Sequence, residues 1–534
     1  MKMKNILLSA LALTFALTSC NEWLDVMPDN RAEVDTAEKV EKLLVSAYPE
    51  NAYIMLAELS SDNVDDFGED SPYSERIYTQ VYQWSEVTES DNEDPKSVWG
   101  ALYGAITNAN QAIVAIEEMG ADTPELKASL GEALLCRAYN HFMLASLFCQ
   151  AYDPATANQD LGIPYMDKPE TELNPQYERG TVADVYAAIE KDLQEGLPLV
   201  NDAGYSVPKY HFNEKAAYTF ASRFYLNFGK WDECIECASK ALGSSPSELL
   251  RDYATLASLP KELGVVGPQY NSTNAKNNFL VQTAYSSLGL IFGPYYFESR
   301  ISAGNLLMQT EMFNNAPWGG LAPSTSSYNY RKMYKLDHYV YVATGFDKTI
   351  LPRLNYLFEY TDPVAGIGYY RTLYAALTAE EALLNRAEAY IMKGQYELAL
   401  ADMNLWTANT LNPSYCDPVL TDEVIKNWAS GMEYYTDTAP TPKKKLNPLL
   451  TTITEGSDME AYVHAILYMR RAEFYMMGLR WLDVKRYGIE ITRRKLGTTL
   501  EVLETYDRLT VDDERRALQL PKDVITAGMT PNPR

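Results

Sequence analysis

Two stretches of the sequence decide the fold, because they repeat one layout. The first is Ala217–Leu242, AYTFASRFYLNFGKWDECIECASKAL, and the second is Ala382–Trp406, ALLNRAEAYIMKGQYELALADMNLW. Each reads as a helix, a tight Gly-X-aromatic turn that begins at Gly229 or Gly394, and a second helix. Small residues stand where the two helices of a pair would cross closely, as in tetratricopeptide repeats. The sequence therefore predicts an all-α scaffold of tetratricopeptide-like helix pairs.

Further helices are predicted from a hydroxyl residue that an acidic residue follows three positions later. This pattern satisfies free backbone N–H groups at the start of a helix. Apolar residues spaced three and four apart then mark one buried stripe per helix. The pattern occurs at Ser129 with Glu132, Thr181 with Asp184, Thr378 with Glu381, and Ser457 with Glu460.

Long irregular segments interrupt the helices. Gly229 and Gly394 are 165 residues apart, which is no clean multiple of the roughly 34-residue tetratricopeptide period. A large insertion, at about 243–374, must therefore separate the two pairs, and we expect irregular loops with minor β-hairpins in it. Shorter irregular regions lie at about 59–95 and 412–456. Their many Tyr and Trp residues argue against disorder, so these segments are candidates for function.

The N-terminus predicts export and lipidation. Lys2 and Lys4 precede a short apolar run, 6–17, which reads as a signal-peptide core and is too short to cross a bilayer. The run ends in Leu17-Thr18-Ser19-Cys20, which resembles a bacterial lipobox. We expect residues 1–19 to be removed, Cys20 to carry acyl chains, and 20–534 to form a single domain. Two or more chains hold a protein stably on a membrane. An ordinary signal peptide with an incidental cysteine is the alternative.

Composition narrows the class of partner. The formal net charge is −26, and removal of Lys2 and Lys4 with the signal peptide would make it −28. Such a chain repels phosphate backbones, so we expect no nucleic-acid partner. Tyr is abundant, with 40 residues against 15 Phe, which suits either wet binding surfaces or helix packing.

Several motifs, in order along the chain, resemble the SusD/RagB family of outer-membrane nutrient-binding lipoproteins. The most specific is 469–488, MRRAEFYMMGLRWLDVKRYG, which is close to the family's RR-x-E…G-x-R-W-x-D-x-K-R-aromatic-G pattern. The other matching pieces are Cys20-Asn21-Glu22-Trp23-Leu24-Asp25 with Pro28, Trp99…Tyr103…Ile106…Asn110, Arg137-Ala138-Tyr139 followed by Gly162-Ile163-Pro164-Tyr165, and the tail Leu520-Pro521…Asn532-Pro533, which is shorter than in the family.

The resemblance implies a role and a location. Members of this family sit, by a lipid anchor, on the outer membrane and face the extracellular side. They cover the mouth of a SusC-like TonB-dependent transporter barrel and deliver to it an oligosaccharide or, in some members, a peptide. The family motifs are structural, so they identify no ligand residue here.

Candidate glycan contacts come from aromatic residues in the irregular segments, because sugar rings stack on Trp and Tyr while polar groups bond their hydroxyls. Trp318 is the leading candidate, with a core tryptophan as the alternative. The other candidates are Tyr295, Tyr296 and Arg300 in the insertion, and Tyr73, Tyr82, Trp84, Asp65 and Asp66 in the earlier region. The hypothesis requires that two or more of the aromatics share one exposed face.

Enzymatic and metal chemistry are not predicted. The four His residues match no catalytic or zinc motif, and His141 reads as a packed helix residue. Cys234 and Cys237 lie at buried-face spacing with no further ligands for zinc. The acidic stretch 62–70 could hold calcium or be a solvated loop. We expect no cofactor, no metal and no enzyme activity.

Three other functions stay open as alternatives. The first is a peptide-binding member of the same family. The second is a surface glycoside hydrolase, which would need two carboxylates across one bond. The third is a purely structural tetratricopeptide scaffold, which would leave the aromatic segments unexplained.

Overall fold

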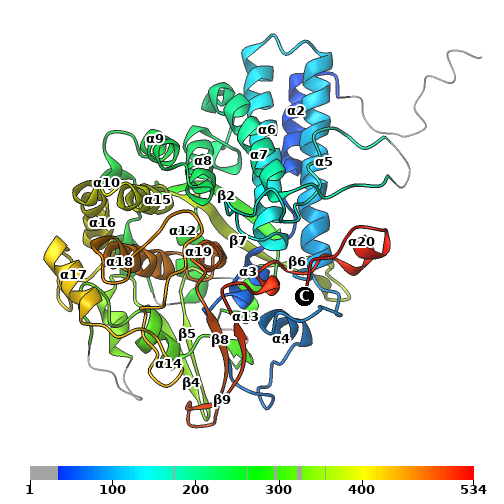
Figure 1. Ribbon diagram of the computed structural model, residues 1–534. Helices are drawn as coiled ribbons and strands as arrows, with labels where there is room; N and C mark the ends of the chain where they lie inside the picture. Colours follow the sequence, from blue (N-terminus) through cyan, green and yellow to red (C-terminus); the bar gives the residue numbers. More distant parts are fainter. Residues whose placement is uncertain (1–33, 172–174, 261, 294–297, 322–327, 355–356) are drawn as a thin grey trace, which may run out of the picture.

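The computed structural model describes residues 34–534 apart from 172–174, 261, 294–297, 322–327 and 355–356 (Figure 1). The predicted signal peptide and Cys20 therefore lie outside the described residues. The structure is mainly helical with small sheets, so the predicted all-α, tetratricopeptide-like class with minor β-hairpins is confirmed. Within the described residues, no helix is long and apolar enough to cross a bilayer.

The two predicted helix pairs are present and lie together. The first consists of α8 (Glu214–Phe228) and α9 (Trp231–Leu242), the second of α15 (Ala379–Met392) and α16 (Tyr396–Thr410). Gly229 and Gly394 turn the chain between the helices with φ of 77° and 68°, a left-handed conformation that suits glycine. Because α15 packs against both α8 and α9, the two pairs stack on each other although they are far apart in the sequence.

The remaining long helices extend this scaffold (Figure 1). On one side, α5 packs against α6 and α6 against α7, while α2 lies on α5 and α6. On the other side, α18 packs against α15 and α17. One hydrophobic core runs from Val40 to Leu520. These helices are α2 (Ala37–Leu44), α5 (Pro95–Glu118), α6 (Pro124–Phe148), α7 (Val182–Gly196), α17 (Asp422–Ser430), α18 (Asp458–Glu473) and α19 (Leu479–Arg486).

Three of the four predicted helix starts are confirmed. The hydroxyls of Thr181, Thr378 and Ser457 each accept a hydrogen bond from the backbone N–H three residues on. The prediction at Ser129 is wrong, because α6 begins earlier. Thr123 caps that helix and Pro124 occupies its first position, where a missing N–H costs nothing.

Three small sheets lie among the irregular segments. Their strand orders are β3-β1-β8-β9, β2-β7-β6 and β4-β5. β1 joins the first irregular region to β8 near the C-terminus, since Asp66 pairs in parallel with Lys495. The strands are β1 (Asp65–Asp66), β2 (Asn278–Tyr285), β3 (Ile301–Ser302), β4 (Tyr339–Ala343), β5 (Phe346–Ile350), β6 (Leu357–Asp362), β7 (Ile367–Thr378), β8 (Ile491–Leu496) and β9 (Val502–Leu509).

Short helices fill the irregular segments. Met308–Met312 forms a π-helical turn, a rare conformation that is frequent at functional sites. The others are α3 (Ile54–Ser60), α4 (Arg76–Tyr82), α10 (Pro246–Leu249), α11 (Tyr253–Ser258), α12 (Leu263–Tyr270), α13 (Leu288–Ile291), α14 (Asn305–Leu307) and α20 (Lys522–Thr526).

Candidate functional site

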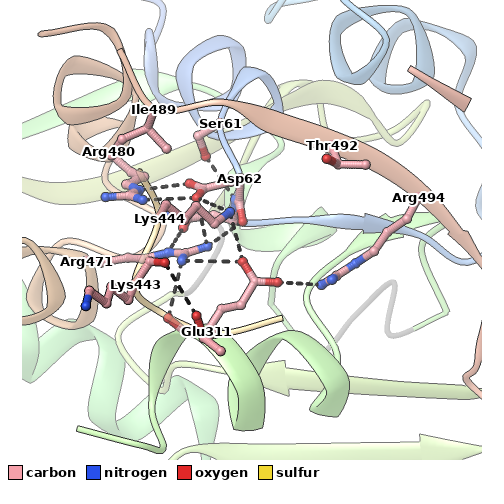
Figure 2. Close-up of polar contacts among 12 residues, drawn as sticks. Ser61, Asp62, Glu311, Lys443, Lys444, Arg471, Arg480, Ile489, Thr492 and Arg494 are labelled. Atoms are coloured by element: carbon pink, nitrogen blue, oxygen red, sulfur yellow. Dashed lines mark hydrogen bonds and ion pairs between the residues drawn. The ribbon is translucent and has the colours of Figure 1, made fainter. Parts of the chain in front are cut away.

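A cluster of buried charges lies where the irregular segments meet α18, α19 and β8 (Figure 2). Asp62 accepts hydrogen bonds from Arg480 Nε at 2.8 Å and from Lys444 Nζ at 2.8 Å. Glu311, in the π-helical turn, contacts Lys444 at 2.9 Å and Arg494 at 3.0 Å. We call this cluster the charged core; it consists of Asp62, Asp65, Glu311, Lys444, Arg471, Arg480 and Arg494.

The electrostatics of the charged core favour the ionised forms of Asp62 and Glu311, whereas burial raises the pKa of Asp65. Burial alone would raise the pKa of Asp62, but the charges of Arg471, Arg480 and Lys444 outweigh burial and hold that pKa well below its usual range. The pKa of Glu311 is lowered by the same balance. A buried pair of this kind adds little net stability, yet loss of one partner leaves an uncompensated charge. The charged core therefore holds together segments that lie far apart in the sequence.

The predicted ligand residues Asp65, Asp66 and Arg300 pair within the chain. Asp65 accepts hydrogen bonds from both Nε and Nη2 of Arg494, at 2.6 and 3.1 Å. Asp66 accepts hydrogen bonds from Nε and Nη2 of Arg300, at 2.8 and 2.9 Å. Asp62, Asp65 and Asp66 are buried, so this part of the acidic stretch is neither a solvated loop nor, among the described residues, part of a cluster that could hold a metal ion.

Trp84 and Tyr82 lie in the core around Arg493. The guanidinium carbon of Arg493 is 3.9 Å from the Trp84 ring centroid and 4.0 Å from that of Tyr82. The Trp84 indole donates to the carbonyl of Ser60 at 2.9 Å. With 4% and 0% of their surface exposed, the two rings are not available for stacking on a sugar in this conformation.

Trp318 is also a core residue, with 3% of its surface exposed. Its ring packs edge-on against Tyr468 at 5.3 Å and lies 5.6 Å from the ring of Trp406. Tyr73 is half-buried, and Tyr295 and Tyr296 lie outside the described residues. The expected exposed face that would combine Trp318 with Trp84 is therefore absent, because both rings fill the interior.

His141, Cys234 and Cys237 lie in the packed interior. His141 is buried between a backbone carbonyl and a backbone N–H, and burial lowers its pKa to about 3. Cys234 and Cys237 are buried on α9, as expected, and burial raises the pKa of both thiols. Neutral, enclosed groups of this kind support packing roles.

An exposed hairpin, β6–β7, carries the aromatic surface that sequence reasoning missed. Its register places Phe358 opposite Tyr370, and Tyr360 opposite Gly368, on one face. The Phe358 ring lies 4.8 Å from that of Tyr360 and 5.0 Å from that of Tyr370. Tyr360 is 57% exposed. We call residues 357–371 the aromatic hairpin.

The opposite face of the aromatic hairpin combines rings with charges. Tyr369 is 49% exposed, and its ring lies 5.4 Å from Tyr285. Arg371 stacks on Tyr285 at 3.9 Å and forms an ion pair with Glu359. Rings beside hydrogen-bonding groups are what a sugar-binding surface needs. The signal that could have revealed the hairpin is the alternation of Phe358, Glu359 and Tyr360 before a Pro/Gly-containing turn.

A groove between α5 and α20 offers a second aromatic-lined surface. Its volume is about 310 Å³, near the lower limit for small-ligand sites. Trp99, Tyr103 and Tyr177 supply the rings, and Glu170 and Gln176 supply polar groups. Only 8% of the surface of Trp99 is exposed, so this ring mainly packs against the core.

Comparison with known proteins is consistent with this architecture. A SusD-like family model described as "Starch-binding associating with outer membrane" matches residues 22–226. No curated protein matches the chain.

Similar solved structures cover nearly the whole chain. A SusD superfamily protein from Bacteroides thetaiotaomicron is 18% identical with a TM-score of 0.63, over 93% of this chain and 100% of the other. A putative sugar binding protein from Bacteroides vulgatus is 17% identical with a TM-score of 0.65, over 94% and 99%. At such identities these structures support the fold. The family model thus confirms the predicted SusD-like resemblance over residues 22–226, and the solved structures support the same fold over nearly the whole chain.

Proposed function

We propose that the protein is an outer-membrane lipoprotein that binds glycans through the aromatic hairpin and passes them to a SusC-like TonB-dependent transporter. The observation that carries the proposal is the exposed face on which Phe358 lies between Tyr360 and Tyr370. Apolar C–H faces of sugars stack on such rings. The family description and the sugar binding named for one similar structure support the ligand class.

Binding, rather than catalysis, is the role that the site chemistry supports. The acids of the charged core are paired with arginine and lysine, and His141 is held by backbone groups. A glycosidase needs one carboxylic acid and one carboxylate that flank an accessible sugar. The strongly acidic chain favours a neutral glycan over a phosphorylated polymer.

Isothermal calorimetry of protein lacking residues 1–20, against a panel of polysaccharides, tests the proposal. We expect Tyr360→Ala to weaken binding by about tenfold or more, which is of the order of one lost stacking contact. Tyr415→Ala is the matched control, because Tyr415 is 47% exposed and lies outside the hairpin. Unchanged binding in Tyr360→Ala with loss in Tyr177→Ala would move the site to the groove between α5 and α20.

A second candidate function, peptide capture, rests on one observation. β6 is an edge strand in the order β2-β7-β6, and an edge strand can pair with an extended peptide through its backbone. Binding of a peptide mixture, together with no response to any glycan in the panel, would favour this function over the first.

A further inference from the structure

A small cavity lies between the insertion and the helical scaffold. Its volume is about 40 Å³. Because one water needs about 10–15 Å³ by this measure, the cavity has room for roughly three water-sized groups. Five aromatic side chains contribute to its wall: Tyr253, Tyr270, Phe313, Tyr334 and Trp406. We call it the aromatic cavity.

Arg353 reaches this cavity with part of its guanidinium unpaired. The side chain is 6% exposed. Its Nη1 donates to the carbonyl of Glu473 at 2.7 Å and to the Tyr270 hydroxyl at 3.3 Å. Its Nε and Nη2 have no hydrogen-bond partner in the described chain, and neither do Thr410 Oγ1 and His338 Nδ1, whose residues also line the cavity. Buried polar groups are almost always paired, so four such atoms around one cavity call for a bound small molecule or water there.

The unpaired edge of Arg353 is the edge that this protein uses for carboxylates. In seven other arginines of the described chain, Nε and Nη2 together contact the two oxygens of one Asp or Glu. That side-on arrangement is the bidentate geometry in which a guanidinium matches a carboxylate. The seven pairs are Arg137–Asp192, Arg223–Glu381, Arg300–Asp66, Arg386–Asp402, Arg480–Asp62, Arg494–Asp65 and Arg515–Asp513.

We propose that the aromatic cavity binds a small carboxylate, of the size of formate or acetate, through Nε and Nη2 of Arg353 and the Thr410 hydroxyl. The volume limits the ligand to about three or four non-hydrogen atoms. Water would satisfy the two N–H groups singly, whereas a carboxylate would accept both in the charge-assisted, bidentate geometry that suits a guanidinium.

Glu473 does not fill this role, although it also lines the cavity. Its carboxylate oxygens accept hydrogen bonds from the Trp406 indole at 2.8 Å and from the Tyr253 hydroxyl at 3.2 Å. Arg353 meets the backbone carbonyl of Glu473 instead. Burial and the nearby Glu380 raise the pKa of Glu473, which reduces its repulsion of a second carboxylate.

Because the cavity lies between the insertion and the scaffold, a bound ligand should stabilise the folded state. Tyr253, Phe313 and Arg353 belong to the insertion, while Trp406 and Thr410 belong to α16 and Glu473 to α18. A carboxylate bound between them would fasten the insertion to the scaffold. Because it binds the folded state alone, it would raise the unfolding temperature, and above its dissociation constant the rise would follow the logarithm of its concentration.

Thermal unfolding in sodium formate, compared with sodium chloride at equal ionic strength, tests the proposal. We expect the midpoint to rise with the logarithm of formate or acetate concentration above the dissociation constant, and not with propionate or benzoate, which exceed the cavity. Arg353→Lys keeps the positive charge but removes the paired Nε and Nη2 donors. We expect it to weaken formate binding about tenfold or more. Arg508→Lys is the control, because Arg508 is exposed and paired at the surface.

A measurement on the unaltered protein guards against a variant that fails to fold. In crystals grown with formate, we expect planar three-atom density against Arg353 Nε and Nη2. Separate water peaks there, with the same midpoint in formate and chloride, would overturn the proposal. So would a formate response that Arg353→Lys retains in full.

Discussion

At the scale of single residues, Asp62 is the acid on which the charged core depends. It contacts Lys444, Arg471 and Arg480. We expect Asp62→Asn to lower the free energy of unfolding by about 3–5 kcal/mol, because it leaves buried cations without a counter-charge. Urea denaturation measures the change. Asp437→Asn, which breaks an exposed pair with Arg508, should cost less than about 1 kcal/mol. Equal losses in the two variants would contradict the role of the charged core.

Glu93 should make stability depend on pH near neutrality. Its carboxylate is buried and accepts the backbone N–H of Ser287, and burial, with Asp91 nearby, raises its pKa from 4.5 to about 7. The folded state therefore holds a proton that the unfolded state releases, so stability falls as pH rises from about 4.5 to about 7. Glu93→Gln has no titrating group at this position. The free energy of unfolding of the wild type, taken relative to that of Glu93→Gln, should therefore fall by on the order of 2–3 kcal/mol as pH rises across that range. A flat difference would refute this assignment.

At the scale of elements, the sequence correctly predicted the features that depend on residues close together in the chain, such as helix pairs and helix starts. The two helix pairs follow from apolar spacing around Gly229 and Gly394, and three helix starts follow from capping residues. The start at Ser129 failed because Thr123 and Pro124 provide a stronger signal upstream. The site residues were harder to predict. Asp65 and Asp66 look like surface ligands until their partners Arg494 and Arg300, more than 200 residues away in the chain, are known.

The aromatic hairpin and the core tryptophan should separate binding from stability. We expect Trp318→Ala to lower the free energy of unfolding by about 3–5 kcal/mol, because it removes a ring packed against Trp406 and Tyr468. The folded fraction should bind glycan as the wild type does. Tyr360→Ala should show the reverse, with little change in urea denaturation and weaker binding by calorimetry. Loss of affinity in Trp318→Ala without loss of stability would restore Trp318 as a ligand residue.

At the scale of the whole molecule, one cysteine should decide where the protein resides. Cys20, which lies outside the described residues, is the predicted site of acylation. We expect Cys20→Ala to abolish labelling by a fatty-acid analogue and to shift the protein from the membrane fraction to the soluble fraction, because acyl chains provide the stable anchor. Unchanged membrane retention in Cys20→Ala would require another attachment.

The charged core has a consequence for the order in which the chain becomes stable during synthesis. Asp62 emerges from the ribosome early, but its partners Lys444, Arg471 and Arg480 follow some 380 to 420 residues later. Until they arrive, the first irregular region cannot be buried without an uncompensated negative charge. The N-terminal half should therefore stay incompletely folded, and competent for export, until the last fifth of the polypeptide has been made. A chain that ends before α18 should be degraded rather than fold as a smaller protein.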